Sequence, residues 1–126
     1  MKHLWIASAI LLGLLVSTQG NSLYLGNIID GYEQQLTQAH ELASQGKWDE
    51  SERITQQVYA DWEGHDFYFH SLLRHVDIDE VRLTFHEVQE YLKLEEADQY
   101  NAANAKLITQ LGLLAEMEQL TLKNVL

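Results

Sequence analysis

The sequence predicts an all-α protein: an N-terminal membrane or signal helix followed by a small antiparallel four-helix bundle of two stacked α-hairpins. Three observations support this prediction. The 126-residue chain has no proline, whereas average usage would give roughly six, and an interior proline costs a helix about 3 kcal/mol. The chain opens with an almost unbroken apolar run. Beyond it, apolar residues recur at spacings of three and four, the period of a helix face. We expect residues 1–21 to form the membrane or signal segment and residues 22–126 the bundle domain.

Composition excludes several classes of protein. Nineteen acidic residues against eight lysines and arginines give a formal net charge of −11. Binding to nucleic acid or to anionic lipid headgroups needs clustered basic residues, so we expect no nucleic-acid partner. The chain has no cysteine, which excludes disulfides, thiolate metal sites, cysteine nucleophiles and a lipidated N-terminal cysteine.

The N-terminal segment has the features of a membrane-targeting sequence. A short basic start precedes the apolar run from Leu4 to Val16, which as a helix is about 20 Å long, shorter than a hydrocarbon core of roughly 30 Å. The uncharged stretch from Leu4 to Leu23 is long enough to span. One interpretation is a single-pass signal anchor, with the N-terminus inside the cytoplasmic membrane and the C-terminal domain outside. The other is cleavage near Gly20 and secretion. Thr18-Gln-Gly20 is a poor match to Ala-x-Ala, which favours the anchor.

Four amphipathic stripes predict the four helices of the bundle. The first stripe comprises Leu25, Ile29, Tyr32, Leu36, Ala39 and Ala43, and the second Val58, Trp62, His65, Phe69, Leu72 and Val76. The third comprises Ile78, Val81, Phe85, Val88 and Leu92, and the fourth Tyr100, Leu107, Leu111 and Leu114. Gly46 is a candidate end for the first helix, and the fourth is expected to run from near Asp98 to around Leu120. Nothing firmly separates the N-terminal segment from the first helix, so one helix could continue through both.

The connections between these helices are short. Residues 45–47, 74–77 and 95–98 leave room only for antiparallel neighbours. Asp77 and Glu80 match a capping box, which would begin the third helix. His40-Glu41-Leu42 and His86-Glu87-Val88 stand 46 residues apart, which hints at an internal repeat of a helix–turn–helix unit.

The histidines do not form a metal-binding pattern. His65, His70 and His75 are five residues apart, which rotates each by about 140° from the last on a helix. Asp79, His86 and Glu90 share a helix face, but nearby Arg82 and Lys93 indicate a solvated face with ion pairs. His65 lies on an apolar stripe, where a core histidine with one hydrogen bond is expected. We expect no metal, no cofactor, no catalytic residue and no enzymatic activity.

Two groups of residues are candidates for function. His75, Asp77 and Glu80 stand at a predicted helix junction, where the imidazole could lock the turn or sense pH. The second group is aromatic and is too large for one helix face, so part of it is expected to face the first helix, the third helix or a partner, and an exposed part would mark a binding site. The candidate partner-binding residues are Trp48, Tyr59, Trp62 and Tyr68.

Several motifs resemble a small bacterial family. These are residues 46–51 (Gly-Lys-Trp-Asp-Glu-Ser), Trp62, residues 75–81 (His-Val-Asp-Ile-Asp-Glu-Val), residues 91–94 (Tyr-Leu-Lys-Leu) and the closing residues 122–126. The family is described only as a domain of unknown function, number forty-three sixty-three, typical of spore-forming Gram-positive bacteria. The resemblance implies one N-terminal membrane segment followed by an acidic helical domain, and it implies no activity, cofactor or catalytic residue.

The sequence leaves two functional interpretations. The first is a non-enzymatic, membrane-tethered extracytoplasmic module that binds another membrane or envelope protein or a second copy of itself. The alternative is an extracytoplasmic sensor or ligand-binding domain that responds to pH or a cation through His75, Asp77, Asp79 and His86.

Overall fold

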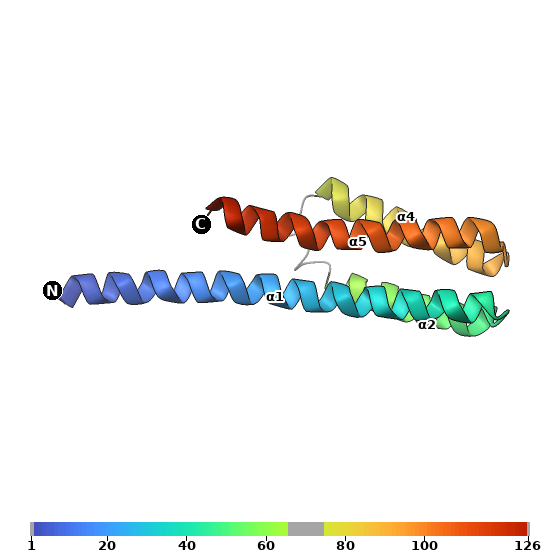
Figure 1. Ribbon diagram of the computed structural model, residues 1–126, viewed down its shortest axis with the longest axis horizontal. Helices are drawn as coiled ribbons and strands as arrows, with labels where there is room; N and C mark the ends of the chain where they lie inside the picture. The colour runs from blue at the N-terminus through green and yellow to red at the C-terminus, as the bar shows by residue number, and fades with distance from the viewer. Residues whose placement is uncertain (1, 66–74, 126) are drawn as a thin grey trace.

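The computed structural model of the chain describes residues 2–65 and 75–125; the side chains of residues 17–23, 75 and 118–125 are outside this description. Four helices make up almost all of the described residues, and they carry the labels of Figure 1. They are α1 (Lys2–Ser44), α2 (Trp48–Gly64), α4 (His75–Lys93) and α5 (Ala97–Val125). The prediction of an all-α fold is confirmed.

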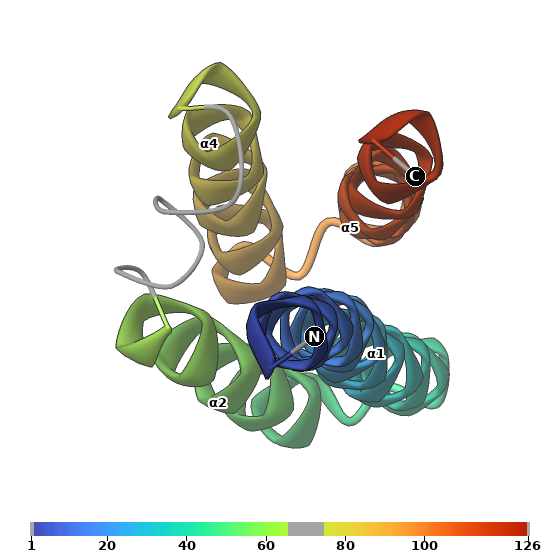
Figure 2. The ribbon, with the colours of Figure 1, turned by 90° about the vertical axis from the view of Figure 1, so that its left-hand side faces the viewer.

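The helices form two hairpins that pack against each other. α1 and α2 form the first hairpin and α4 and α5 the second; between the hairpins, α1 contacts α5 and α2 contacts α4. Each helix runs antiparallel to its neighbours, and Figure 2 shows the four helices arranged around a common centre. The short connections at Gly46 and Glu95 lie together at one end, called here the closed end (Figure 1). The opposite end, where α1 continues beyond the bundle, is called the open end.

The first, third and fourth predicted stripes form the core together with Val58 and Trp62 of the second. Apolar side chains that are at most 5% exposed come from all four helices: Leu25, Ile29, Tyr32, Leu36, Ala39, Ala43, Val58, Trp62, Ile78, Val81, Phe85, Val88, Leu92, Tyr100, Ala103, Leu107, Leu111 and Leu114. Because each helix has one covered stripe and charged residues elsewhere, burial of the stripes accounts for the packing of the two hairpins.

The buried positions repeat every 49 residues. Residues 29, 32, 36, 39 and 43 of α1 correspond to 78, 81, 85, 88 and 92 of α4, and residues 51, 55, 58 and 62 of α2 to 100, 104, 107 and 111 of α5. The two hairpins therefore share one burial pattern. The interval differs from the 46 residues suggested by the two His-Glu pairs, which mark no structural period.

Both hairpin turns close with the same backbone arrangement. At the first, the N–H groups of Gly46 and Lys47 donate to the carbonyls of Ala43 and Leu42 at 3.0 and 2.9 Å. Gly46 has a φ of 81°, as the αL residue of a Schellman motif requires. The predicted helix end at Gly46 is confirmed.

The second turn repeats this arrangement with a glutamate in the αL position. Glu95 and Glu96 donate to the carbonyls of Leu92 and Tyr91 at 3.2 and 3.1 Å, and Glu95 has a φ of 53°. A side chain at positive φ carries a steric cost that glycine avoids. The second turn is therefore strained where the first is not.

The helix boundaries around the middle of the chain differ from the prediction. α2 ends at Gly64 and Val76 belongs to another helix, so the second stripe is wrong at Val76. Glycine favours helix ends, and the His65 N–H donates to the carbonyls of Asp61 and Trp62, closing the last turn. Val76 belongs to α4 and is 60% exposed. Phe69 and Leu72 lie outside the described residues.

The boundaries of the other helices also differ from those predicted from the sequence. α4 begins at His75, so Asp77 occupies the first turn and is not the N-cap; the predicted capping box is wrong, although an acid in the first turn still complements the helix dipole. α5 begins at Ala97 and continues to Val125, beyond the predicted fade at Leu120. α1 is a single helix, so no break separates residues 2–21 from residues 22–44.

Candidate functional site

The first feature that calls for a functional explanation is the N-terminal part of α1. It extends past the end of α5 at the open end, unaccompanied by any other described helix (Figure 1). Leu4, Trp5 and Ile6 are 73%, 80% and 59% exposed, and consecutive residues point about 100° apart on a helix. Large exposed apolar side chains continue along this part of the helix, at Ile10, Leu11, Leu12, Leu14 and Val16. The segment therefore presents large exposed apolar side chains in all directions around its axis.

Such a surface is unusual for a helix in water. A helix that is apolar all round is normally buried in a core or in a membrane, and exposed apolar patches of this kind mark sites of interaction. Among the residues whose side chains the structure describes, no helix carries an apolar stretch long enough to cross a membrane.

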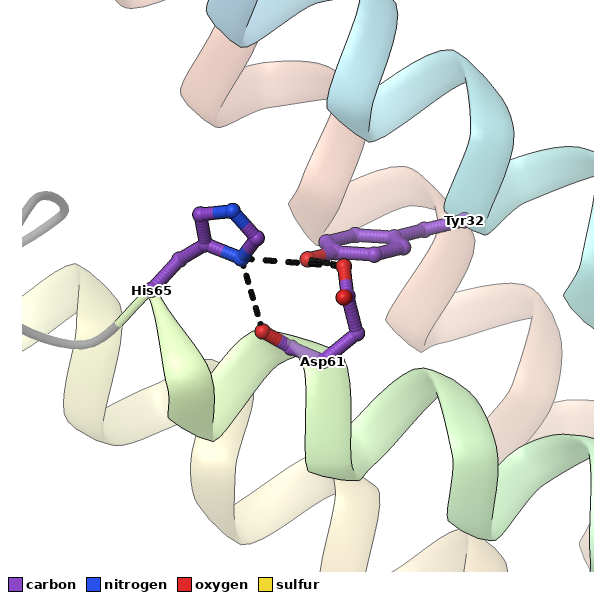
Figure 3. Close-up of polar contacts among 3 residues, drawn as sticks. All are labelled: Tyr32, Asp61 and His65. Carbon is purple, nitrogen blue, oxygen red and sulfur yellow. Dashed lines mark hydrogen bonds and ion pairs between the residues drawn. The ribbon is translucent and has the colours of Figure 1, made fainter.

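A polar cluster near the open end joins α1 to α2. The Tyr32 hydroxyl donates a hydrogen bond of 2.6 Å to Oδ2 of Asp61. The His65 ring lies beside the same residue, with Nδ1 2.8 Å from the Asp61 carbonyl oxygen and 3.6 Å from Oδ2 (Figure 3). Because a carbonyl only accepts, Nδ1 carries the donated hydrogen. The Tyr32 ring also meets the edge of Trp62 at a centroid distance of 6.4 Å.

The chemistry of this cluster is that of a structural tie. Burial, and then the hydrogen bond to the Asp61 carboxylate, raise the pKa of Tyr32 above its ordinary value. The phenol is therefore held neutral and acts as a hydrogen-bond donor, not as a base or nucleophile. Sequence analysis missed this contact. The signal was present, since a buried tyrosine hydroxyl needs a polar partner.

A second cluster lies at the closed end. Ser51 Oγ donates to the Ala39 carbonyl at 2.7 Å and lies 3.4 Å from the Tyr100 hydroxyl. The Tyr100 ring stacks with His40 at 6.2 Å and meets Trp48 edge-on at 6.1 Å. Burial raises the pKa of Tyr100, partly offset by the Ser51 hydrogen bond. One turn along α5, Asn104 Nδ2 donates to the Leu36 carbonyl at 3.1 Å. These bonds fix the positions of α2 and α5 along α1.

The candidate partner-binding residues occupy different environments. Trp48 and Tyr59 are half-buried and pack against the core; the Tyr59 ring lies 5.3 Å from Phe85 and 5.4 Å from His86. Trp62 has no exposed surface. This corrects the expectation that its ring is accessible, since it fills the core between Tyr32 and Phe85. Tyr68 lies outside the described residues.

The candidate junction and sensing residues are spread along α4. His75 is its first residue, with a side chain outside the description; Asp77 is half-buried and Glu80 exposed. Asp79, His86 and Glu90 are exposed. Arg82 pairs with Glu63 at 3.3 Å and approaches Asp79 at 3.8 Å, as a solvated face with ion pairs would. In residues 2–65 and 75–125, no three His, Asp or Glu side chains converge as a metal site.

Comparison with known proteins identifies a family whose function is unknown. No curated protein and no solved structure is significantly similar to the chain. The sequence profile described as Domain of unknown function (DUF4363) matches residues 21–125, which include all of the bundle core. The matched region covers most of the sequence, and it confirms the resemblance seen in the motifs. The chain is a member of the DUF4363 family.

Proposed function

We propose that the protein is a non-enzymatic helical module that the N-terminal part of α1 tethers to the cytoplasmic membrane, with the bundle on the outer side. The observation that carries this proposal is the N-terminal segment of α1, apolar and exposed on every face from Leu4 to Val16. A partner protein helix would cover one face of such a segment, whereas lipid covers all of them.

The distribution of charge supports the orientation. The N-terminal segment carries Lys2, and no acidic residue lies between Lys2 and Asp30. Positively charged ends tend to remain on the cytoplasmic side. The acidic residues belong to the bundle, which would repel anionic headgroups and so needs the apolar segment to hold it at the membrane.

Fractionation of membranes from cells that express the full chain tests the tether. Wild-type protein is expected to remain with the membrane after alkaline carbonate washing. Leu11→Lys places a charge at the centre of the segment at a cost of about 3 kcal/mol, so it should move most of the protein to the soluble fraction. Leu83→Lys is the matched control, because Leu83 on α4 is 65% exposed and Leu11 62%.

Two results of this fractionation would contradict the proposal. One is release of the wild-type chain by carbonate. The other is equal retention of the Leu11→Lys and Leu83→Lys proteins, which would show that the apolar segment does not hold the chain at the membrane.

For the bundle itself, we propose a role as a binding module or accessory subunit of another membrane or envelope protein, or of a second copy. Trp48 and Tyr59 are the remaining candidates in the described residues, because both aromatic side chains are half-buried and so keep part of their surface exposed for contact. A photo-crosslinking amino acid at Tyr59 should capture one defined protein in native membranes. The same group at Thr109, exposed on α5, should not. Equal capture from both positions, or none from Tyr59, argues against this role.

A pH-responsive role is the second candidate, favoured by one observation. The His65 ring is 29% exposed and lies 3.6 Å from the Asp61 carboxylate, so a change in its charge would act directly on the tie between α1 and α2. The thermal midpoint of the full chain in detergent should then differ between pH 5 and 8, and His65→Gln should remove the difference. A flat response in the wild type rejects this candidate, and a midpoint unchanged by Zn²⁺ or Ca²⁺ rejects its cation-responsive form.

A further inference from the structure

The position of the bundle along α1 can be located from its contacts with α5. The two helices run antiparallel, and a methyl group at Gly112 would come within 3.1 Å of the Glu33 carboxylate. Val125 is thirteen residues beyond Gly112, so it lies level with about residue 20 of α1. The bond from Asn104 to the Leu36 carbonyl places Val125 level with about residue 15 by the same count. α5 therefore ends beside residues 15–20 of α1, as Figure 1 shows.

This level coincides with the end of the apolar run. Val16 is the last large apolar residue of the exposed segment, and the sequence continues with Ser17, Thr18 and Gln19. The part of α1 that no other described helix accompanies is thus the part that is apolar. The last described residue of α5 and the end of the apolar run of α1 therefore lie at about the same level.

The charge of α5 restricts how far lipid can extend along α1. Lys123 belongs to a stretch of α5 backbone level with about residues 17–22 of α1, by the same two counts. A bilayer boundary at Leu23 would bring this stretch of backbone below the interface. A charge costs about 3 kcal/mol at the bilayer centre and less near the interface, so the lysine of this stretch disfavours a boundary at Leu23 by part of that amount.

We propose that the boundary between lipid and water lies at the end of α5, near residue 17 of α1, and that only Leu4–Val16 enters the hydrocarbon. This inference rests on the proposed membrane tether and specifies its position. Residues 17–23 then lie among the headgroups beside the C-terminal turn of α5, and the bundle stands directly on the membrane surface. Because α1 is one helix from Lys2 to Ser44, no flexible linker separates membrane from bundle.

The inserted length has a physical consequence. Thirteen helical residues are about 20 Å long, roughly 10 Å shorter than an average hydrocarbon core. Lys2 inside lipid would cost up to about 3 kcal/mol, and local thinning, at fractions of a kcal/mol per Å, lets it reach the surface. The helix therefore crosses a bilayer that is thinned around it, with Lys2 extending to the inner surface and Trp5 near the inner interface.

Cysteine labelling locates the boundary directly, because the chain has no cysteine of its own. Single-cysteine variants Ala9→Cys, Asn21→Cys and Asn27→Cys of the full chain are reconstituted in vesicles and exposed to a membrane-impermeant thiol reagent. Asn21→Cys and Asn27→Cys are expected to react alike, and Ala9→Cys only after detergent is added. Protection of Asn21→Cys to the level of Ala9→Cys overturns the inference and leaves the tether intact. Equal reaction of all three without detergent rejects both.

Bilayer thickness provides a second, independent measurement. Vesicles of dimyristoleoyl, dioleoyl and dierucoyl phosphatidylcholine differ only in the thickness of the hydrocarbon core. A short insert predicts that the fraction of chain retained after carbonate washing is highest in the thinnest bilayer and falls severalfold in the thickest. Equal retention in all three, or best retention in the thickest bilayer, contradicts an insert limited to Leu4–Val16.

Discussion

Tyr32 shows how one polar atom in a core stripe can decide the contact between two helices. Its ring fills the stripe of α1 while its hydroxyl reaches Asp61 of α2. The stripe was predictable from spacing alone. The partner was not, because α2 offers several acidic residues and only the rotation of α2 about its axis selects Asp61. Sequence spacing thus locates the buried residues and leaves the polar pairs to the packing.

The raised pKa of Tyr32 predicts a loss of stability in alkaline solution. Folding holds the phenol protonated, whereas in the unfolded chain it releases its proton at about pH 10. The contribution is therefore fully present below pH 10 and lost as the pH rises above it. Tyr32→Phe should cost about 1 kcal/mol at pH 7, and the difference from the wild type should shrink near pH 11. Urea unfolding at the two pH values measures this; a difference independent of pH would contradict it.

Glu33 gives a second prediction with the same sign of pH dependence, at lower pH. Burial against α5, and then the neighbouring Asp30, raise its pKa, so the ionised form is disfavoured in the folded state. Its contribution is present at low pH and lost as the pH rises through the folded pKa. Glu33→Gln should therefore raise the thermal midpoint at pH 7, and the gain should vanish near pH 4. Glu41→Gln, at an exposed position of the same helix, is the control and should not reproduce this pattern.

At the scale of elements, the two hairpin turns form a natural comparison. Both use a Schellman motif, but Gly46 meets its positive φ without strain and Glu95 does not. The first turn is predictable from the sequence because glycine is the usual residue at the left-handed position of a helix end. The second was located by its short connection alone, since a glutamate gives no sign of a left-handed conformation. The same limitation explains why the sequence predicts a longer second helix. The apolar spacing continues past Gly64, whereas α2 ends at that residue.

Substitutions at the turns should have opposite effects. Gly46→Ala forces a side chain into positive φ and should cost about 1 kcal/mol, whereas Glu95→Gly should stabilise the bundle by up to about 1 kcal/mol. Gly31→Ala is the reference. Gly31 lies inside α1, where an added Cβ would meet nothing within 4 Å, and alanine there should stabilise by about 0.5–1 kcal/mol. Chemical denaturation of the three variants measures these changes; equal effects of the two alanine substitutions would contradict the turn assignment.

At the scale of the whole molecule, two hairpins with one burial pattern form the bundle. Among the described helices, α1 is the one that extends well beyond it. The 49-residue interval of the buried positions makes α1 and α4 equivalent within the bundle. They differ outside it, since α1 is 43 residues long and α4 only 19. The extra length is the exposed apolar segment, so it is an addition to a complete bundle and not a part of its core. The sequence predicted this division from composition, and it left open whether the helix would break between the two parts.

As proposed, this apolar segment of α1 remains attached to the bundle and holds it at the membrane. The most direct test is the intact mass of the chain recovered from carbonate-washed membranes of cells that produce it. A tethered protein is expected to show the mass of a chain that retains α1 from its N-terminal residues, and to be found in the membrane fraction. A chain that lacks about the first twenty residues and is found outside the membrane would contradict it, because cleavage near Gly20 would leave a secreted bundle without a tether.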